Sequence, residues 1–84
     1  MNNPERFEGD VLIILADEFG LEEDHPLDGP LFSNDLLDSM DVLKLINHLE
    51  NRFEIKLPTF EVSLEMLDTI EQIAKLVAKR KGSG

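Results

Sequence analysis

The sequence predicts an all-α fold, a small bundle of three main helices plus one short helix, with a long loop between the first two helices. Apolar residues recur at helical spacing in three segments, whereas no segment shows the alternation of a β-strand. Prolines and glycines interrupt the chain between the first two of these segments. We expect the 84 residues to form a single domain over 1–84, with its core at about 4–81 and a flexible tail at 82–84.

Charge and composition exclude several classes of function. Acidic residues number 18 and basic residues 8, so the net charge is −10 and the field of the chain repels nucleic acid. Residues 1–38 contain eleven of the acids and one base. The absence of cysteine excludes disulfides and thiolate metal sites, and no apolar run approaches the roughly 20 residues of a membrane span. We therefore expect a cytoplasmic monomer without membrane insertion, a resident metal ion or a nucleic-acid partner.

The first helix is predicted over residues 4–19. Asn3 is a favourable N-cap, and Pro4 at the first helical position loses no hydrogen bond. Gly20 follows, where a left-handed residue commonly ends a helix. The apolar stripe consists of Phe7, Val11, Ile14 and Leu15, widened by Leu12 and Phe19.

Residues 21–38 are predicted to form a structured loop. Pro26, Gly29 and Pro30 prevent a continuous helix, and loops of this length are usually functional or disordered. Apolar side chains argue for order, because they can pin the loop to the core. They are Leu27, Leu31, Phe32, Leu36 and Leu37.

The second helix is predicted over residues 39–53 and has the clearest start signal in the chain. Asp38 can cap it, Asp41 can return the contact in a capping box, and Leu37 can close a hydrophobic staple with Val42. The apolar face contains Val42, Leu45, Ile46, Leu49 and Phe53, extended by Leu43. The outward face contains Met40, Lys44, Asn47, His48 and Asn51.

The rest of the chain supplies a short helix and the last long one. Residues 59–64 can form one or two helical turns. Asp68, with Glu71 three residues later, is expected to open the last helix. Its inner face holds Ile70, Ile73, Ala74 and Val77, and its basic end holds Lys79, Arg80 and Lys81, which complement the helix dipole.

The tripeptide Asp38-Ser39-Met40 follows this loop and opens an amphipathic helix. With the helix order and with Phe53-x-Ile55-x-Leu57-Pro58 after the second helix, it resembles the acyl carrier protein family over residues of about 7–80. In that family the serine of the tripeptide receives 4′-phosphopantetheine. The resemblance implies that Ser39 carries this arm, that Asp38 and Met40 are the flanking motif, and that an acyl or aminoacyl group is held as a thioester.

The local chemistry of Ser39 agrees with that role. The first turn of a helix offers free N–H groups and a dipole that favour an anion. The reactive thiol comes with the cofactor, and a separate phosphopantetheinyl transferase attaches the arm. The resemblance therefore implies a carrier protein and not an enzyme. Its implied partners are that transferase, an acyl- or aminoacyl-loading enzyme, and downstream transferases of fatty acid, polyketide or nonribosomal peptide biosynthesis.

Within the family, the chain looks more like D-alanyl carrier proteins and related stand-alone aminoacyl carriers. The stretch 58–69 is slightly longer than in fatty-acid carriers, and it contains the Asp68-Thr69 pair of the D-alanyl group, although Leu67 stands where those proteins often have Trp. Charges balance over residues 39–53, unlike the acidic helix of fatty-acid carriers. The predicted partner-binding residues are therefore of mixed character: Met40, Asp41, Lys44, Asn47 and His48.

Other interpretations compete with a carrier. One is a small acidic helical module that binds proteins without a covalent cofactor. The run 24–35 has the glycine of an EF-hand, but Pro26 stands at a ligand position and the last position lacks glutamate, which leaves only loose association with divalent cations. His25 and His48 lie in different elements and lack the spacing of a catalytic or metal-binding pair.

Overall fold

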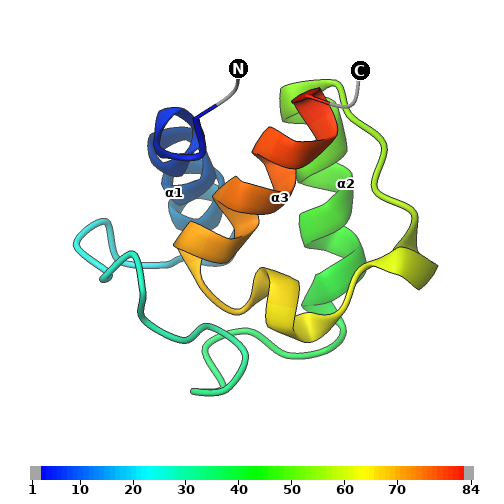
Figure 1. Ribbon diagram of the computed structural model, residues 1–84. Helices are drawn as coiled ribbons and strands as arrows, with labels where there is room; N and C mark the ends of the chain where they lie inside the picture. The colour runs from blue at the N-terminus through cyan, green and yellow to red at the C-terminus, as the bar shows by residue number, and fades with distance from the viewer. Residues whose placement is uncertain (1–2, 83–84) are drawn as a thin grey trace.

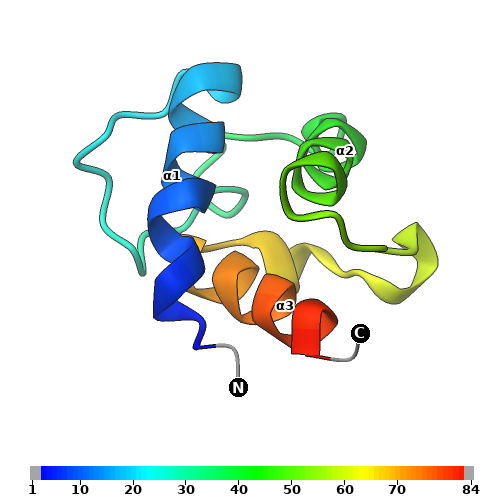
Figure 2. The ribbon, with the colours of Figure 1, turned by 90° about the horizontal axis from the view of Figure 1, so that it is seen from above.

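The computed structural model describes residues 3–82 and places them in an all-helical bundle. Helices α1 (Glu5–Phe19), α2 (Asp41–Phe53) and α3 (Ile70–Gly82) are joined by the long loop and by two 3-10 turns, η1 (Thr59–Glu61) and η2 (Leu64–Leu67). Figure 1 shows the loop and η2 at one end of the bundle, with the start of α1 and the end of α3 at the other. Figure 2, which looks along α2, shows the three helices around a common interior. The predicted fold class is confirmed.

Helix α1 begins and ends as its sequence predicts. Asn3 Oδ1 accepts a hydrogen bond from the Glu5 N–H at 3.1 Å. Gly20 ends the helix with a φ of 73°, and the N–H groups of Gly20 and Leu21 both donate to the Leu15 carbonyl. Glycine suits this left-handed position because it carries no Cβ.

The apolar core lies between the three helices and takes in part of the loop. Of the five side chains predicted to pin the loop, Leu31 and Leu37 are buried, and Phe32 packs against the core while partly exposed. The other two, Leu27 and Leu36, are exposed. The central buried side chains of the helices are Val11, Ile14 and Leu15 of α1, Leu45, Ile46 and Leu49 of α2, and Ile70, Ile73 and Val77 of α3.

The prediction for Leu43 was wrong. We expected this side chain to extend the apolar face of α2, yet it is 60% exposed. Val42 packs at the edge of the core, and the next residue lies about 100° further around a helix, given its roughly 3.6 residues per turn, which turns Leu43 to solvent. Leu43 therefore shares a face with Met40, three residues earlier.

Cations from neighbouring helices reach the C-terminal carbonyls of α1 and α2. Helix α1 has no basic residue in its own last turn, and Lys44 of α2 donates to the Glu18 carbonyl at 3.5 Å. Lys81 of α3 donates to the carbonyl of Phe53, the last residue of α2, at 2.8 Å. These contacts place positive charge where the helix dipoles are negative.

The segment after α2 differs from its prediction in two respects. The expected short helix over 59–64 is two separate 3-10 turns, and the second turn, η2, extends past that range. Asp68 does not cap the last helix. Thr69 does so instead, because its Oγ1 accepts the Gln72 N–H at 3.0 Å, and α3 then begins at Ile70.

Two further expectations concern the C-terminal tail and membrane insertion. Gly82 closes α3, and the remainder of the predicted tail, 83–84, lies outside the described residues. Within 3–82, no helix combines the length and the apolar character needed to cross a bilayer.

Candidate functional site

The start of α2 is held by the predicted capping box. Asp38 Oδ1 accepts hydrogen bonds from the N–H groups of Met40 and Asp41, at 2.9 and 3.3 Å. Asp41 Oδ2 accepts the Asp38 N–H at 3.1 Å in return. The box is therefore confirmed, and a cap of this kind stabilises a helix by about 1 kcal/mol.

Ser39 lies inside this box and is exposed. Both neighbouring carboxylates are engaged with backbone N–H groups, and no residue within 3–82 hydrogen-bonds to the Ser39 hydroxyl. The backbone around the serine is thus fixed while its Oγ stays open to solvent.

One expectation about this turn was wrong. We expected free N–H groups in the first turn to favour an anion on Ser39, but Asp38 already occupies those of Met40 and Asp41. The N–H groups of Met40 and Asp41 are therefore not free to bind a phosphate on Ser39. Its attachment needs an exposed hydroxyl and a defined backbone, and both are present.

A second carboxylate organises the loop that leads to Ser39. Asp68 Oδ1 accepts the N–H groups of Leu31, Phe32 and Ser33 at 3.2, 2.7 and 3.0 Å. Asp68 Oδ2 accepts the Ser33 hydroxyl at 2.6 Å, and the Asp68 carbonyl accepts the Leu31 N–H at 2.6 Å. We call this set of contacts the Asp68 clamp.

The clamp favours the charged form of Asp68. The pKa of this carboxyl lies below its ordinary value, chiefly because of the Ser33 hydroxyl and then the Ser33 N–H. Partial burial opposes the shift, and the N–H groups of Phe32 and Leu31 add to it. Hydrogen bonds to a carboxylate favour its ionised state, so Asp68 acts here as an anion.

The predicted outward face of α2 divides into two. Met40 is 85% exposed and shares one side of the helix with Leu43 and Asn47, which are also exposed. We call Met40, Leu43 and Asn47 the docking face. Their spacing of three and four residues places them in one row.

Lys44 and His48 lie beside this row and contact α1. The Lys44 ammonium lies 5.1 Å from the centre of the Phe19 ring, and His48 Nε2 lies 3.5 Å from Glu18 Oε1. Arg52, further along α2, pairs with Asp10 at 3.0 Å. The cations of α2 are thus directed to α1.

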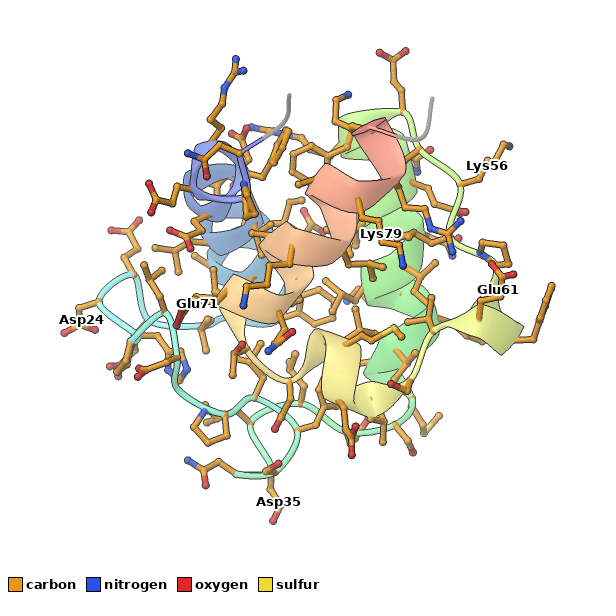
Figure 3. The ribbon with its side chains drawn as sticks, viewed as in Figure 1. Asp24, Asp35, Lys56, Glu61, Glu71 and Lys79 are labelled. Carbon is orange, nitrogen blue, oxygen red and sulfur yellow. The ribbon has the colours of Figure 1, made fainter. Side chains whose placement is uncertain are left out.

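Acidic side chains surround the start of α2. Asp35 and Asp38 are exposed, and Asp41 is partly exposed. Figure 3 shows Asp35 projecting from the loop, away from the helices, whereas Asp24 projects from the part of the loop on the opposite side of the bundle from α2. With Lys44 directed to α1, this end of the protein presents apolar side chains beside negative charge.

The other candidate ligands do not gather into a site. Across residues 3–82, no group of three or more His, Cys, Asp or Glu side chains could hold a metal ion. His25 Nε2 lies 3.1 Å from the Gly29 carbonyl and so belongs to the internal structure of the loop. His25 lies in the loop and His48 in α2, so the two histidines belong to different elements, as the sequence indicates.

Comparison with known proteins identifies the family. The family model described as "Phosphopantetheine attachment site" matches residues 10–77. This chain belongs to that phosphopantetheine-binding family. It is a carrier protein, and its prosthetic group is 4′-phosphopantetheine. Such carriers work with transferases and loading enzymes.

Curated relatives include both aminoacyl and acyl carriers. A D-alanyl carrier protein of Streptococcus sanguinis is 31% identical over 74 residues, which cover 88% of this carrier and 94% of that protein. One from Lactococcus lactis subsp. lactis is 43% identical over 66 residues, covering 79% and 78%. An acyl carrier protein of Chlorobium phaeobacteroides is 31% identical over 71 residues, covering 83% and 88%. The similarity to D-alanyl carriers inferred from the sequence is confirmed.

Proposed function

We propose that Ser39 carries the 4′-phosphopantetheine arm. The observation that supports this assignment is the exposed hydroxyl of Ser39 inside a capping box whose two carboxylates are already engaged. When the arm is bound, its thiol supplies the thioester chemistry. Asp38 and Met40 then act as the flanking motif: the first fixes the turn, and the second stands beside the serine on the surface.

The general base for arm attachment does not come from this chain. The Ser39 Oγ attacks the phosphorus on the pantetheine side of the coenzyme A pyrophosphate. A phosphodiester forms, the bridging P–O bond breaks, 3′,5′-ADP leaves with the electron pair of that bond, and a base takes the hydroxyl proton. Asp38 and Asp41 accept backbone N–H groups, and within residues 3–82 neither carboxylate is hydrogen-bonded to the Ser39 hydroxyl. The transferase therefore supplies the base, and this chain is the substrate and not the enzyme.

The cargo is an acyl or aminoacyl group, delivered within a specialised biosynthetic pathway. A D-alanyl cargo is favoured by the D-alanyl carrier proteins among the relatives named above, one of which is 43% identical to this chain over 66 residues. Modification of a cell-wall polymer is the corresponding pathway. The need for coenzyme A places the reaction in the cytoplasm, and the charge of −10 favours a monomer without nucleic-acid contacts.

Partner enzymes approach across the docking face. An enzyme that reaches an arm on Ser39 meets Met40 and Leu43 first, with acidic side chains beside them. The fitting partner surface is an apolar pocket with a basic rim, in which the pocket supplies affinity and the rim speeds association. Asp41 belongs to the acidic edge, and Asn47 continues the row. Lys44 and His48 border the face from the side of α1.

Mass spectrometry tests the assignment. The apo protein is incubated with coenzyme A and a promiscuous phosphopantetheinyl transferase, and the modified peptide is mapped. The parent and a Ser63→Ala control should each gain one arm, whereas Ser39→Ala should gain none and keep the parent's helicity. An arm on the Ser39→Ala protein, or an unmodified parent, contradicts the proposal and leaves the interaction module without cofactor as the alternative.

A further inference from the structure

We propose that Asp68 is a positioning residue for Ser39, one that sets the efficiency of arm attachment through the loop before α2. This inference rests on the proposed attachment at Ser39. Asp68 makes no direct contact with the serine, and its effect is carried by the segment 31–37. The clamp described above fixes the first three residues of that segment.

Hydrogen bonds continue from the clamp towards Ser39. The Leu31 carbonyl accepts the Leu37 N–H at 3.0 Å, so the two ends of the segment are joined. Between them, the Asp35 N–H donates to the Phe32 carbonyl at 3.1 Å, and Asp35 takes a left-handed φ of 59°. The segment is therefore a closed turn and not an extended linker.

This closed turn leads directly into the capping box. Leu37 is buried, and Asp38, the next residue, is the cap of α2. Ser39 thus lies inside the capping box, and the loop that enters this box is held by the Asp68 clamp. The box is local to the helix, whereas the clamp fixes where the loop lies against the bundle.

Two backbone bonds between the loop and the start of α3 survive removal of the Asp68 side chain: the Leu31 N–H still donates to the Asp68 carbonyl, and the Glu71 N–H to the Leu27 carbonyl at 3.1 Å. Neither of them holds Phe32 or Ser33, the other two residues of the clamp. A pocket of about 200 Å³ lies against it, lined by Phe32, Ser33, Leu64, Glu65 and Asp68. Removal of the Asp68 carboxylate would leave the N–H groups of Phe32 and Ser33 facing this space, where water can take its place. The loop would then keep its buried leucines and its internal backbone bonds, but lose the side-chain bonds that hold Phe32 and Ser33 against the start of α3.

The clamp is separable from the stability of α3. Thr69 caps that helix, so loss of the Asp68 side chain leaves the cap intact. Thr69→Ala removes the cap and leaves the clamp intact. This adjacent pair distinguishes an effect on the loop from a general loss of stability.

The test compares four apo proteins: the parent, Asp68→Ala, Asp68→Asn and Thr69→Ala. Arm attachment is followed with coenzyme A and a phosphopantetheinyl transferase, at a temperature where circular dichroism shows every protein folded. Asp68→Ala should raise the KM for the carrier about tenfold with little change in kcat, because the transferase must order the loop on binding. Asp68→Asn should lie in between, since its Oδ1 can still accept the N–H groups. Thr69→Ala should keep the parental KM.

Amide hydrogen exchange gives a readout that is independent of the transferase. The Phe32 and Ser33 amides should exchange faster in Asp68→Ala than in the parent, and in Thr69→Ala they should not. If Asp68→Ala does not fold, Ser33→Ala removes only the hydroxyl bond to Oδ2 and should raise the KM about twofold.

The outcomes separate this inference from the assignment of Ser39. A parental KM in Asp68→Ala, or an equal rise in Thr69→Ala, overturns the positioning role and leaves attachment at Ser39 standing. A parent that accepts no arm, or accepts it at another residue, overturns the assignment of Ser39 and the positioning role with it.

Discussion

The ammonium of Lys44 lies 5.1 Å from the centre of the Phe19 ring, so a cation of α2 covers the last residue of α1. The same group donates to the Glu18 carbonyl. Lys44 therefore serves the packing of α1 on α2, in addition to any contact with a partner. A cation over an exposed aromatic face contributes about 0.5–1 kcal/mol.

Charge reversal at Lys44 should destabilise the fold. Lys44→Glu loses the contact with Phe19 and places a carboxylate at the negative end of α1, beside Glu18. We expect a loss of about 1 kcal/mol in the free energy of unfolding, measured by urea titration. Lys75→Glu, the same charge change on the exposed side of α3, should cost less than about 0.5 kcal/mol. Equal losses in the two variants would show that the contact with Phe19 does not contribute.

Truncation of the docking face should slow cargo loading. Met40→Ala and Leu43→Ala should each lower the loading rate of the arm-bearing protein with its cognate enzyme by about tenfold, near 1–2 kcal/mol, if these side chains fill a partner pocket. Ile13→Ala serves as the control, because Ile13 is also exposed but lies on α1. If both docking-face variants load at the parental rate, the loading enzyme recognises another surface, and the acidic loop 21–38 is the next candidate.

Stability should depend on pH through Asp68. The folded pKa of this carboxyl lies below its ordinary value of about 3.9. The unfolded chain therefore binds the proton more tightly, and the clamp's contribution is complete above the ordinary pKa and is lost as pH falls through the lower folded pKa. The stability difference between the parent and Asp68→Asn, from urea midpoints, should shrink below about pH 4.

A neighbouring variant controls the pH experiment. Thr69→Ala destabilises α3 without removing a titratable group, so its profile should run parallel to that of the parent. A difference between the parent and Asp68→Asn that stays constant down to acid pH would argue against an ionised clamp.

The uneven distribution of charge should make the fold sensitive to salt. Residues 1–38 contain eleven acids and one base, and these carboxylates repel one another in the folded state. Added NaCl or millimolar Mg²⁺ should raise the Tm, and neutralising exposed acids, as in Glu23→Gln with Asp24→Asn, should reduce that response. A Tm that does not change with salt would indicate that the carboxylates of residues 1–38 repel one another only weakly. Tight, stoichiometric Ca²⁺ binding would revive the EF-hand interpretation.

Local contacts could be predicted from the sequence, and contacts between distant residues could not. The capping box at Asp38 and Asp41 depends on residues three positions apart, and the end of α1 depends on the backbone freedom of Gly20. Both are encoded within one helical turn. The place of Ser39 in the first turn followed from the same local pattern, whereas its role as the attachment residue was implied by the resemblance of nearly the whole chain to the carrier family.

The clamp and the α1–α2 contacts depend on how the helices pack. Asp68 and Thr69 are both good caps, and the sequence alone could not show that Asp68 would be drawn to the loop by three N–H groups. Lys44 lies on the polar side of α2, but its direction towards Phe19 depends on where α1 ends. The sequence did offer one signal for the role of Asp68. Asp68 and Thr69 are adjacent and both can cap a helix, and because a helix needs only one cap, the other residue is free for a different contact.

The Asp68 clamp also bears on the order of events during synthesis. Asp68 is added to the growing chain well after Ser39, and Lys81, which reaches the end of α2, is added later still. A nascent chain that has emerged only as far as α2 lacks the carboxylate that holds residues 31–33. We therefore expect efficient arm attachment to wait until the last helix has left the ribosome.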